Sequence, residues 1–215
     1  MTYTSLTRLP ELASTDRAEL DRLLDDTTVG HFAFMAGERP VAMPTGIARD
    51  GDRVLAHGST GSGWMRLLAT GTPASLAVTS FEGLVVARSA FESSMLYRSA
   101  VLFGRCEQLK DQPEKEAALD VLTEAFLPGR AAEIRRPSAR ELAATLVLSF
   151  PIAEWSLKIS NHWPDDPAED VAGPAWAGLV SRSITVGDVR GAPDLRAGIP
   201  VPASVWRLID HGYRP

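Results

Sequence analysis

Ten residues in the first third of the chain, Leu55 to Trp64, combine glycine and hydroxyl side chains in a way that could bind an anion. The segment reads LAHGSTGSGW and lies between an apolar, strand-like run and the helix-like segment WMRLLATG. Glycines expose backbone N–H groups, Ser59, Thr60 and Ser62 add hydroxyl donors, and the start of a helix favours negative charge. The same composition is typical of a polar surface loop, so the residues alone leave both interpretations open.

The loop matches none of the familiar nucleotide-binding or hydrolase motifs. A Walker loop requires GxxxxGK[ST], and this segment contains no lysine. Its glycines do not follow the GxGxxG order, and its serines do not have the GxSxG spacing of a nucleophile elbow. Arg66 could add positive charge beside a bound anion. His57 ends the preceding strand-like run, where it could contact a ligand or have a structural role.

A second group of polar side chains lies in the segment ARSAFESSMLYRSAV, which otherwise has the character of strands. It contains Arg88, Tyr97, Arg98 and Ser99. An arginine is costly to bury in a strand unless it faces solvent or meets an anion. The segment is therefore either an exposed strand face or a sheet surface on which Arg98 and Ser99 contact an anionic ligand. Trp163, in the polar segment SNHWPDD, could cover a flat ligand.

Composition limits the class of protein. The chain has 215 residues, of which 45% are hydrophobic and 23% charged, as in an ordinary folded domain. The net charge of −5 and the scattered arginines argue against a nucleic-acid partner. The single cysteine, Cys106, suits a reducing compartment, and no signal peptide or membrane-spanning run is recognisable. The four histidines are far apart, so we expect no metal site, and we expect a cytoplasmic protein without a membrane partner.

The elements that must position these residues read as short strands separated by turns. Expected strands cover 29–36, 41–48, 53–59, 74–81, 83–90, 95–109 (bulged at Gly104), 147–160 in one or two pieces, and 177–186. Asp50-Gly51 and Glu82-Gly83 are the expected turns of two hairpins. Expected helices follow Asp16 and cover 63–69, 112–126, 139–144 and 203–209. Because no βαβ alternation is present, the pattern favours a β-barrel or sandwich with peripheral helices.

Taken together, these segments resemble the pyridoxamine 5′-phosphate oxidase-like, FMN-binding split-barrel family. Within it, they are most similar to the flavin-nucleotide-binding branch that includes nitroimidazole-resistance-type proteins. The resemblance runs from about Val29 to Trp176 and is carried by MPTGIARDGDRVLAHGSTGSGWMRLL and VTSFEGLVVARSAFESSMLYRSAVLFGRCEQL, and more weakly by EWSLKIS and WAGLV. It implies a mainly β protein, a six-stranded antiparallel split β-barrel with flanking helices. The expected domains are an N-terminal helical segment (1–28), the FMN-binding barrel (29–181) and an unassigned C-terminal extension (182–215).

The resemblance also implies a homodimer with two FMN molecules held between its subunits. Residues Thr45 and Gly46 would lie beside the isoalloxazine ring. The ring and ribityl chain would be approached by His57, Gly58 and Ser59, and the phosphate by Ser62, Gly63, Trp64 and Arg66. Further contacts would come from Tyr97, Arg98 and Ser99, across the dimer. Pyridoxamine-phosphate oxidases carry an arginine–lysine pair where this chain reads Ser62-Gly63-Trp64, which favours general flavin chemistry over vitamin B6 oxidation.

The function implied by the resemblance is an FMN-dependent oxidoreductase. It would pass electrons from a reduced nicotinamide to a small acceptor such as a nitro compound, a quinone or oxygen. His57 is the candidate catalytic residue. Two alternatives remain open: a non-catalytic flavin-binding or storage protein, and the same barrel binding haem or a deazaflavin.

Overall fold

The structure, a computed structural model, describes residue 4 and residues 9–211, with the side chains of the last helix described to residue 210. The outer ends of the expected segments 1–28 and 182–215 therefore lie outside the described residues. The strands are β1 (Ala13–Ser14), β2 (Val29–Ala36), β3 (Arg39–Asp50), β4 (Arg53–Ser59), β5 (Pro73–Val86), β6 (Ser94–Arg105), β7 (Glu107–Gln108), β8 (Thr145–Pro151), β9 (Glu154–Ser160) and β10 (Gly178–Ser181). The helices are α1 (Arg17–Asp25), α2 (Gly63–Ala69), α3 (Gln112–Phe126), α4 (Ala139–Ala144), α5 (Ala168–Val171) and α6 (Ala203–His211), with the 3-10 turns η1 (Pro10–Leu12) and η2 (Ala131–Glu133).

Local sequence signals explain where the helices begin. The carboxylate of Asp16 accepts a hydrogen bond from the Ala18 N–H at 2.8 Å, which caps α1. Helix α3 begins with a proline in its first turn and is capped by Asp111. Helix α4 has a complete capping box, in which the side chains of Ser138 and Glu141 each accept from the other residue's N–H.

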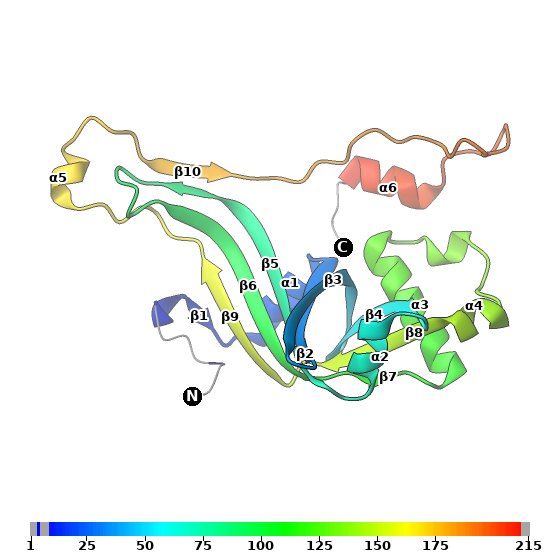
Figure 1. Ribbon diagram of the computed structural model, residues 1–215. Helices are drawn as coiled ribbons and strands as arrows, with labels where there is room; N and C mark the ends of the chain where they lie inside the picture. The colour runs from blue at the N-terminus through cyan, green and yellow to red at the C-terminus, as the bar shows by residue number, and fades with distance from the viewer. Residues whose placement is uncertain (1–3, 5–8, 212–215) are drawn as a thin grey trace.

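The described strands form one antiparallel sheet in the order β1-β9-β6-β5-β2-β3-β4-β8-β7, with β10 paired to β5. The sheet coils but does not close, and this confirms the expected mainly β split barrel with flanking helices. The β5–β6 hairpin is much longer than the barrel is tall. Its far end, together with β10 and α5, projects from the barrel as an arm (Figure 1).

Two expectations about the strands that form the arm are wrong. Residues 74–81 and 83–90 are not two strands around a turn, because β5 runs unbroken to Val86 and only its register shifts, between Phe81 and Gly83. A side chain at Gly83 would collide with the carbonyl oxygen of Val180 in β10, so this glycine permits β10 to approach rather than a turn to form. Gly104 lies in regular register opposite Ala74 and is not bulged.

The two faces of the sheet have different neighbours. The face that we call inner carries Phe32, Ile47 and Leu76, and it packs against the leucines of α1 in the main core. The opposite, outer face is covered at β3, β4 and β8 by α3, through a smaller core that includes Ala48, Leu55 and Val147. Over β2, β5 and β6 the outer face does not belong to this smaller core, and the segment that follows β10 comes near it at Val29, together with Leu208 of α6.

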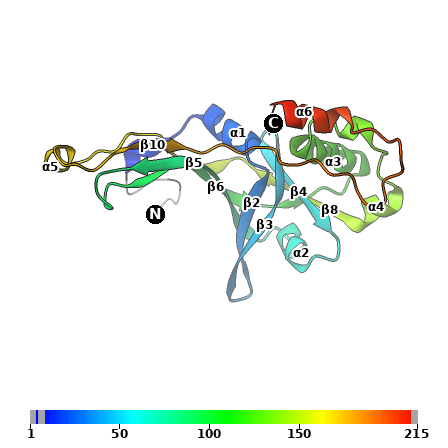
Figure 2. The same ribbon diagram turned by 90° about the horizontal axis from the view of Figure 1, so that it is seen from above.

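Beyond β10 the chain runs as a mostly exposed strap, residues 182–202, back across the molecule to α6 (Figure 2). Helix α6 lies beside α3 and η2. The N–H of Ser204 donates to Glu133 at 2.9 Å, and the Arg207 guanidinium donates to the carbonyl of Pro128 at 3.2 Å. The strap is therefore attached at the arm by β10 and at the helical side by α6.

Candidate functional site

The glycine-rich loop joins the end of β4 to the start of α2, as the sequence predicts. Gly58 lies where the strand and the helix approach each other most closely. A Cβ atom at this position would overlap the sulfur of Met65, a fully buried residue of α2. Glycine is therefore needed at position 58 for α2 to pack against the strand, and the strand in turn fixes the position of the loop.

Hydrogen bonds from its own residues hold the loop in place. The Ser59 hydroxyl accepts from the N–H of Gly61 at 3.0 Å, and the Arg66 guanidinium donates to the carbonyl of Thr60 at 2.9 Å. Thr60 is also tied to the end of α4, because its N–H and its hydroxyl donate to the carbonyl of Ala144 at 2.9 and 3.2 Å. Ser59, Thr60 and Arg66, which the sequence offered as donors to a ligand, thus already form hydrogen bonds within the chain.

The remaining donors of the loop are free within the described part of the chain. The Ser62 hydroxyl makes no capping bond to α2, and the N–H groups of Gly63 and Trp64 have no acceptor among the described residues. A Cβ atom at Gly63 would meet nothing within 4 Å. The indole of Trp64 packs against the core, 6.4 Å from the rings of Phe32 and Phe34, and is partly buried there, so the loop presents chiefly the main chain of Trp64. The free donors together suit an anionic oxygen group.

His57 lies on the outer face at the end of β4, opposite Val147 of β8. Although part of the ring is exposed, its contact with the protein removes water and lowers the pKa of His57 from its usual value. The neutral imidazole is thus the favoured form near neutral pH. Thr45 and Gly46, which were predicted to lie beside the isoalloxazine ring, are half-buried on β3. Gly46 lies directly against the ring of Phe126 from α3.

The structure separates the second predicted group from the first within one chain. Tyr97, Arg98 and Ser99 lie on β6, and β5, β2 and β3 come between β6 and β4 in the sheet. Arg98 faces inward and forms ion pairs with Glu82 and, at 2.8 Å, with Asp26. Its charge is balanced by these carboxylates, whereas Tyr97 and Ser99 point to the outer face. A contact between the two groups across a dimer stays a prediction.

Arg88 also has an internal partner. Its guanidinium and its backbone N–H donate to the two carboxylate oxygens of Asp166 at 2.9 and 2.8 Å, and the Asp166 side chain is fully buried. The anion that an arginine in this position requires is therefore supplied by the chain itself. Trp163, nearby in sequence, is 69% exposed, in agreement with its position in a polar loop.

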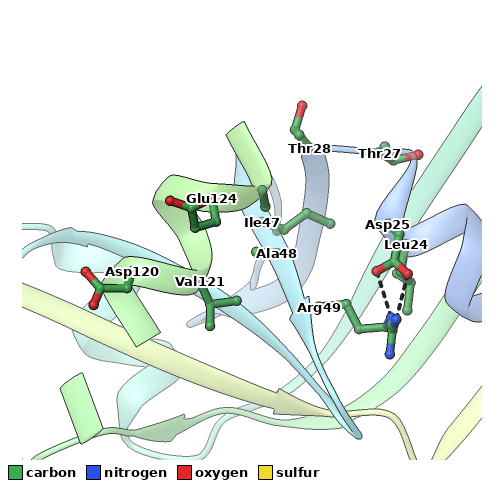
Figure 3. Close-up of a pocket in the computed structure, with 11 residues that line it drawn as sticks. Leu24, Asp25, Thr27, Thr28, Ile47, Ala48, Arg49, Asp120, Val121 and Glu124 are labelled. Carbon is green, nitrogen blue, oxygen red and sulfur yellow. Dashed lines mark hydrogen bonds and ion pairs between the residues drawn. The ribbon is translucent and has the colours of Figure 1, made fainter. Parts of the chain in front are cut away.

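The sequence analysis did not anticipate a hollow of about 440 Å³ between the end of α1, β3 and α3 (Figure 3). Arg49 pairs here with Asp25, at 2.8 and 2.6 Å, and Glu124 accepts from the N–H groups of Gly129 and Ala131. These charged groups thus have partners within the chain, Arg49 and Asp25 in each other and Glu124 in two backbone N–H groups. Its residues come from segments far apart in the chain and form no local motif that could have revealed it.

Two features are absent from the described residues. No three or more His, Cys, Asp or Glu side chains of this part of the chain are grouped as metal ligands. None of its helices is both long enough and apolar enough to cross a membrane.

Comparison with known proteins gives a family model and similar structures that cover most of the chain. The family model described as pyridoxamine 5′-phosphate oxidase matches residues 16–159. The FAD and haem binding protein from Mycobacterium smegmatis is 49% identical, with 91% of this chain and 96% of that chain covered and a TM-score of 0.87. The flavocytochrome Anf3 from Azotobacter vinelandii is 33% identical, with 95% of each chain covered and a TM-score of 0.89.

A more distant structure, named for 5-nitroimidazole antibiotic resistance, comes from Bacteroides thetaiotaomicron and shows the fold alone. It is 16% identical, with 68% of this chain and 86% of that chain covered and a TM-score of 0.59. No curated protein matches the chain. The family model and the two similar structures cover the barrel and the loop between β4 and α2, and the chain belongs to the pyridoxamine 5′-phosphate oxidase-like family.

Proposed function

We propose that this chain is a flavin-binding redox protein that also carries haem. The observation that carries the proposal is the 49% identity, over 91% of the chain, to a protein described as binding both FAD and haem. The second similar structure is described as a flavocytochrome, a name for proteins that hold both groups. A bound flavin supplies hydride and electron transfer, while the protein determines where the flavin lies and what it meets.

The loop between β4 and α2 has the donor set that a flavin phosphate needs. The Ser62 hydroxyl and the N–H groups of Gly63 and Trp64 are free among the described residues, and the space beside Gly63 is open. The loop is already held by Ser59 and Thr60, so binding would order few additional groups. We therefore place the phosphate at these donors and the ribityl chain along the end of β4, where His57 would face the ring as its nearest titratable group.

The nature of the flavin is a separate question. FMN is what the sequence resemblance implies, whereas the M. smegmatis protein is described with FAD. Both molecules have the isoalloxazine ring, the ribityl chain and the first phosphate, so the same loop suits either one. We favour FAD because the relative described with it is similar along almost the whole chain.

The proposal extends to assembly and to substrates. We propose a homodimer, because the arm carries apolar side chains that water would otherwise surround: Leu84, Met95 and Val180 are 44%, 50% and 47% exposed. We propose that electrons come from a reduced nicotinamide and go to a small acceptor such as oxygen, a quinone or a nitro compound. A cytoplasmic location agrees with the single buried cysteine.

The first test is the absorption spectrum of the purified protein. Flavin should give bands near roughly 370 and 450 nm, and haem should add a Soret band. Mass measurement of the flavin released by denaturation distinguishes FAD from FMN. Oxidation of reduced nicotinamide with each acceptor then separates an oxidoreductase from a storage protein. A colourless protein that neither flavin stabilises against thermal unfolding would refute the proposal.

A charge placed in the loop tests the site itself. Ser62→Asp should weaken flavin binding at least tenfold, because it puts a carboxylate among the donors intended for phosphate. Ala139→Asp is the matched control, since it adds the same charge to the exposed first turn of α4. Equal flavin affinity in Ser62→Asp and in the control would show that the phosphate binds elsewhere.

A further inference from the structure

We propose that His31 is the iron ligand of a haem that lies flat against the outer face of β2, β3, β5 and β6. This inference rests on the proposed function, since it assumes that the chain carries haem. The arrangement of the sheet around His31 supports it, and so does the position of each other histidine whose side chain the structure describes.

His31 lies in the middle of the sheet and points outward. It is directly opposite Pro44 of β3 on one side and Ala77 of β5 on the other, and Ala77 is in turn opposite Val101 of β6. Residues that face one another across an antiparallel sheet share a face, so these four side chains form one row. The preceding residue Gly30 and the following residue Phe32 face the core, and the imidazole of His31 is exposed.

The surface around His31 is mainly apolar, with Ser75 of β5 opposite Ala33 as a polar neighbour. Along β2 its neighbours on the same face are Val29 and Ala33, and Ala42 of β3 lies opposite Ala33. From β3 to β6 the face is about 14 Å wide, and Val29 to Ala33 spans about 14 Å along the strand, which gives a porphyrin room to lie on it. Val29 and Met35 are 48% and 49% exposed, so much of this apolar surface meets water, although the strap passes close enough to line a hollow together with Val29. A planar apolar ligand would remove it from water.

Among the described residues of β2, β3, β5 and β6, His31 is the one histidine, and a histidine is the usual proximal ligand of haem iron. The edge of the same face supplies a cation: Lys158 of β9 lies opposite Ser99 of β6 and forms no ion pair with any described residue. A haem centred near His31 would direct its propionates toward such a charge. An apolar centre with a nitrogen ligand and a cation at the edge is the arrangement that haem requires.

The other histidines with described side chains are less suited to this role. His57 lies at the flavin loop, where Val147 is its cross-strand neighbour. In the polar loop of the arm, the Nδ1 atom of His162 is 2.8 Å from the carbonyl of Trp163, and the loop offers no sheet surface. His57 thus also has an apolar cross-strand neighbour, but Val147 belongs to the core that α3 covers, whereas His31 has small apolar residues on both adjacent strands.

The test compares four single substitutions in the full-length protein, reconstituted with ferric haem and with flavin. His31→Ala should lower haem affinity at least tenfold and should shift the Soret band and the ferric EPR signal. His162→Ala is the matched control and should keep both signatures of the wild type. His57→Ala tests the histidine at the flavin loop and should keep the haem Soret band and EPR signal, whatever it does to flavin binding. Added imidazole should restore the wild-type spectrum to His31→Ala, which a merely structural role would not allow. Lys158→Gln should weaken haem binding several-fold while leaving the iron spectrum unchanged.

Each outcome bears on a different claim. If His31→Ala keeps the wild-type Soret band, EPR signal and affinity, the assignment of His31 is wrong. The assignment also fails if only His57→Ala or His162→Ala loses the signal. A wild-type protein that binds flavin but no haem would overturn the haem inference and leave flavin binding intact. A wild-type protein that binds neither would refute the proposed function itself. The melting temperature of each variant, together with the flavin content of the variants other than His57→Ala, shows that it has folded.

Discussion

Replacing Gly58 by alanine should destabilise the protein, although the same exchange a few residues later should not. At position 58 the new Cβ atom would overlap the sulfur of Met65, which is 1% exposed and enclosed by the main core. Because the core leaves Met65 little room to move, we expect a loss of about 1–3 kcal/mol in the free energy of unfolding. For a chain of this size, such a loss lowers the melting temperature by about 2–12 °C.

Gly63→Ala is the control for this experiment. A Cβ at Gly63 meets nothing within 4 Å, and the residue begins helix α2 with no positive φ. The exchange should therefore stabilise the protein by about 0.4–1 kcal/mol, because alanine reduces the freedom of the unfolded chain. The two variants carry the same added methyl group, and they should move the melting temperature in opposite directions.

A double-mutant cycle identifies the contact that is responsible. Met65→Ala alone should cost about 2–5 kcal/mol, because it leaves a cavity in the core. In the double variant the methyl group at position 58 enters that cavity, so the combined cost should be clearly less than the sum of the two single costs. Urea unfolding of the four proteins measures these free energies. If Gly58→Ala is as stable as the wild type, or if the two costs add, the strand and helix do not touch as described.

Three further predictions concern single side chains. Arg98→Met should lower the free energy of unfolding by about 1 kcal/mol, because it leaves the charges of Glu82 and Asp26 unbalanced. Flavin binding should stay unchanged. Loss of flavin without loss of stability would instead make Arg98 a cofactor contact. Burial lowers the pKa of His57 in the folded protein below its value in the unfolded chain. As the pH falls through about 6.5, His57 therefore binds a proton more readily in the unfolded state than in the folded state. The wild type should therefore lose stability between about pH 7 and 5, and His57→Gln should lose less in pH-dependent thermal unfolding; parallel curves would contradict this. Burial also raises the pKa of the Cys106 thiol to about 12, so a thiol reagent should label Cys106 only after the protein unfolds, and rapid labelling of the native protein would contradict its burial.

The sequence predicted elements best where local chemistry determines them. Strands β2 and β4 and helices α2, α3 and α4 have the expected bounds, because caps, a proline in a first turn and glycine turns are local signals. Both turns that close the first hairpins contain a glycine with positive φ, 64° at Gly37 and 59° at Gly51. These features require no knowledge of distant parts of the chain.

The errors and omissions lie where distant segments meet. Gly83 looked like a turn residue, but β10 from almost a hundred residues later packs over it. Arg88 and Arg98 looked available for a ligand, but carboxylates far away in the chain occupy them. His31 has no distinguishing motif in the sequence, and only the order of the strands places it between Pro44 and Ala77. Such relations depend on topology, which no local pattern contains.

The strap of residues 182–202 has a consequence for how the arm is held. It is fixed at one end by the pairing of β10 with β5 and at the other by α6, which binds through Ser204 and Arg207. The strap therefore keeps α6 close to its site, so that α6 has a high local concentration there. Its binding costs less entropy than the binding of a free peptide would. A cut within the strap would leave every strand of the barrel in place. The arm and the helical side would then lose their second covalent link and become free to change their relative orientation.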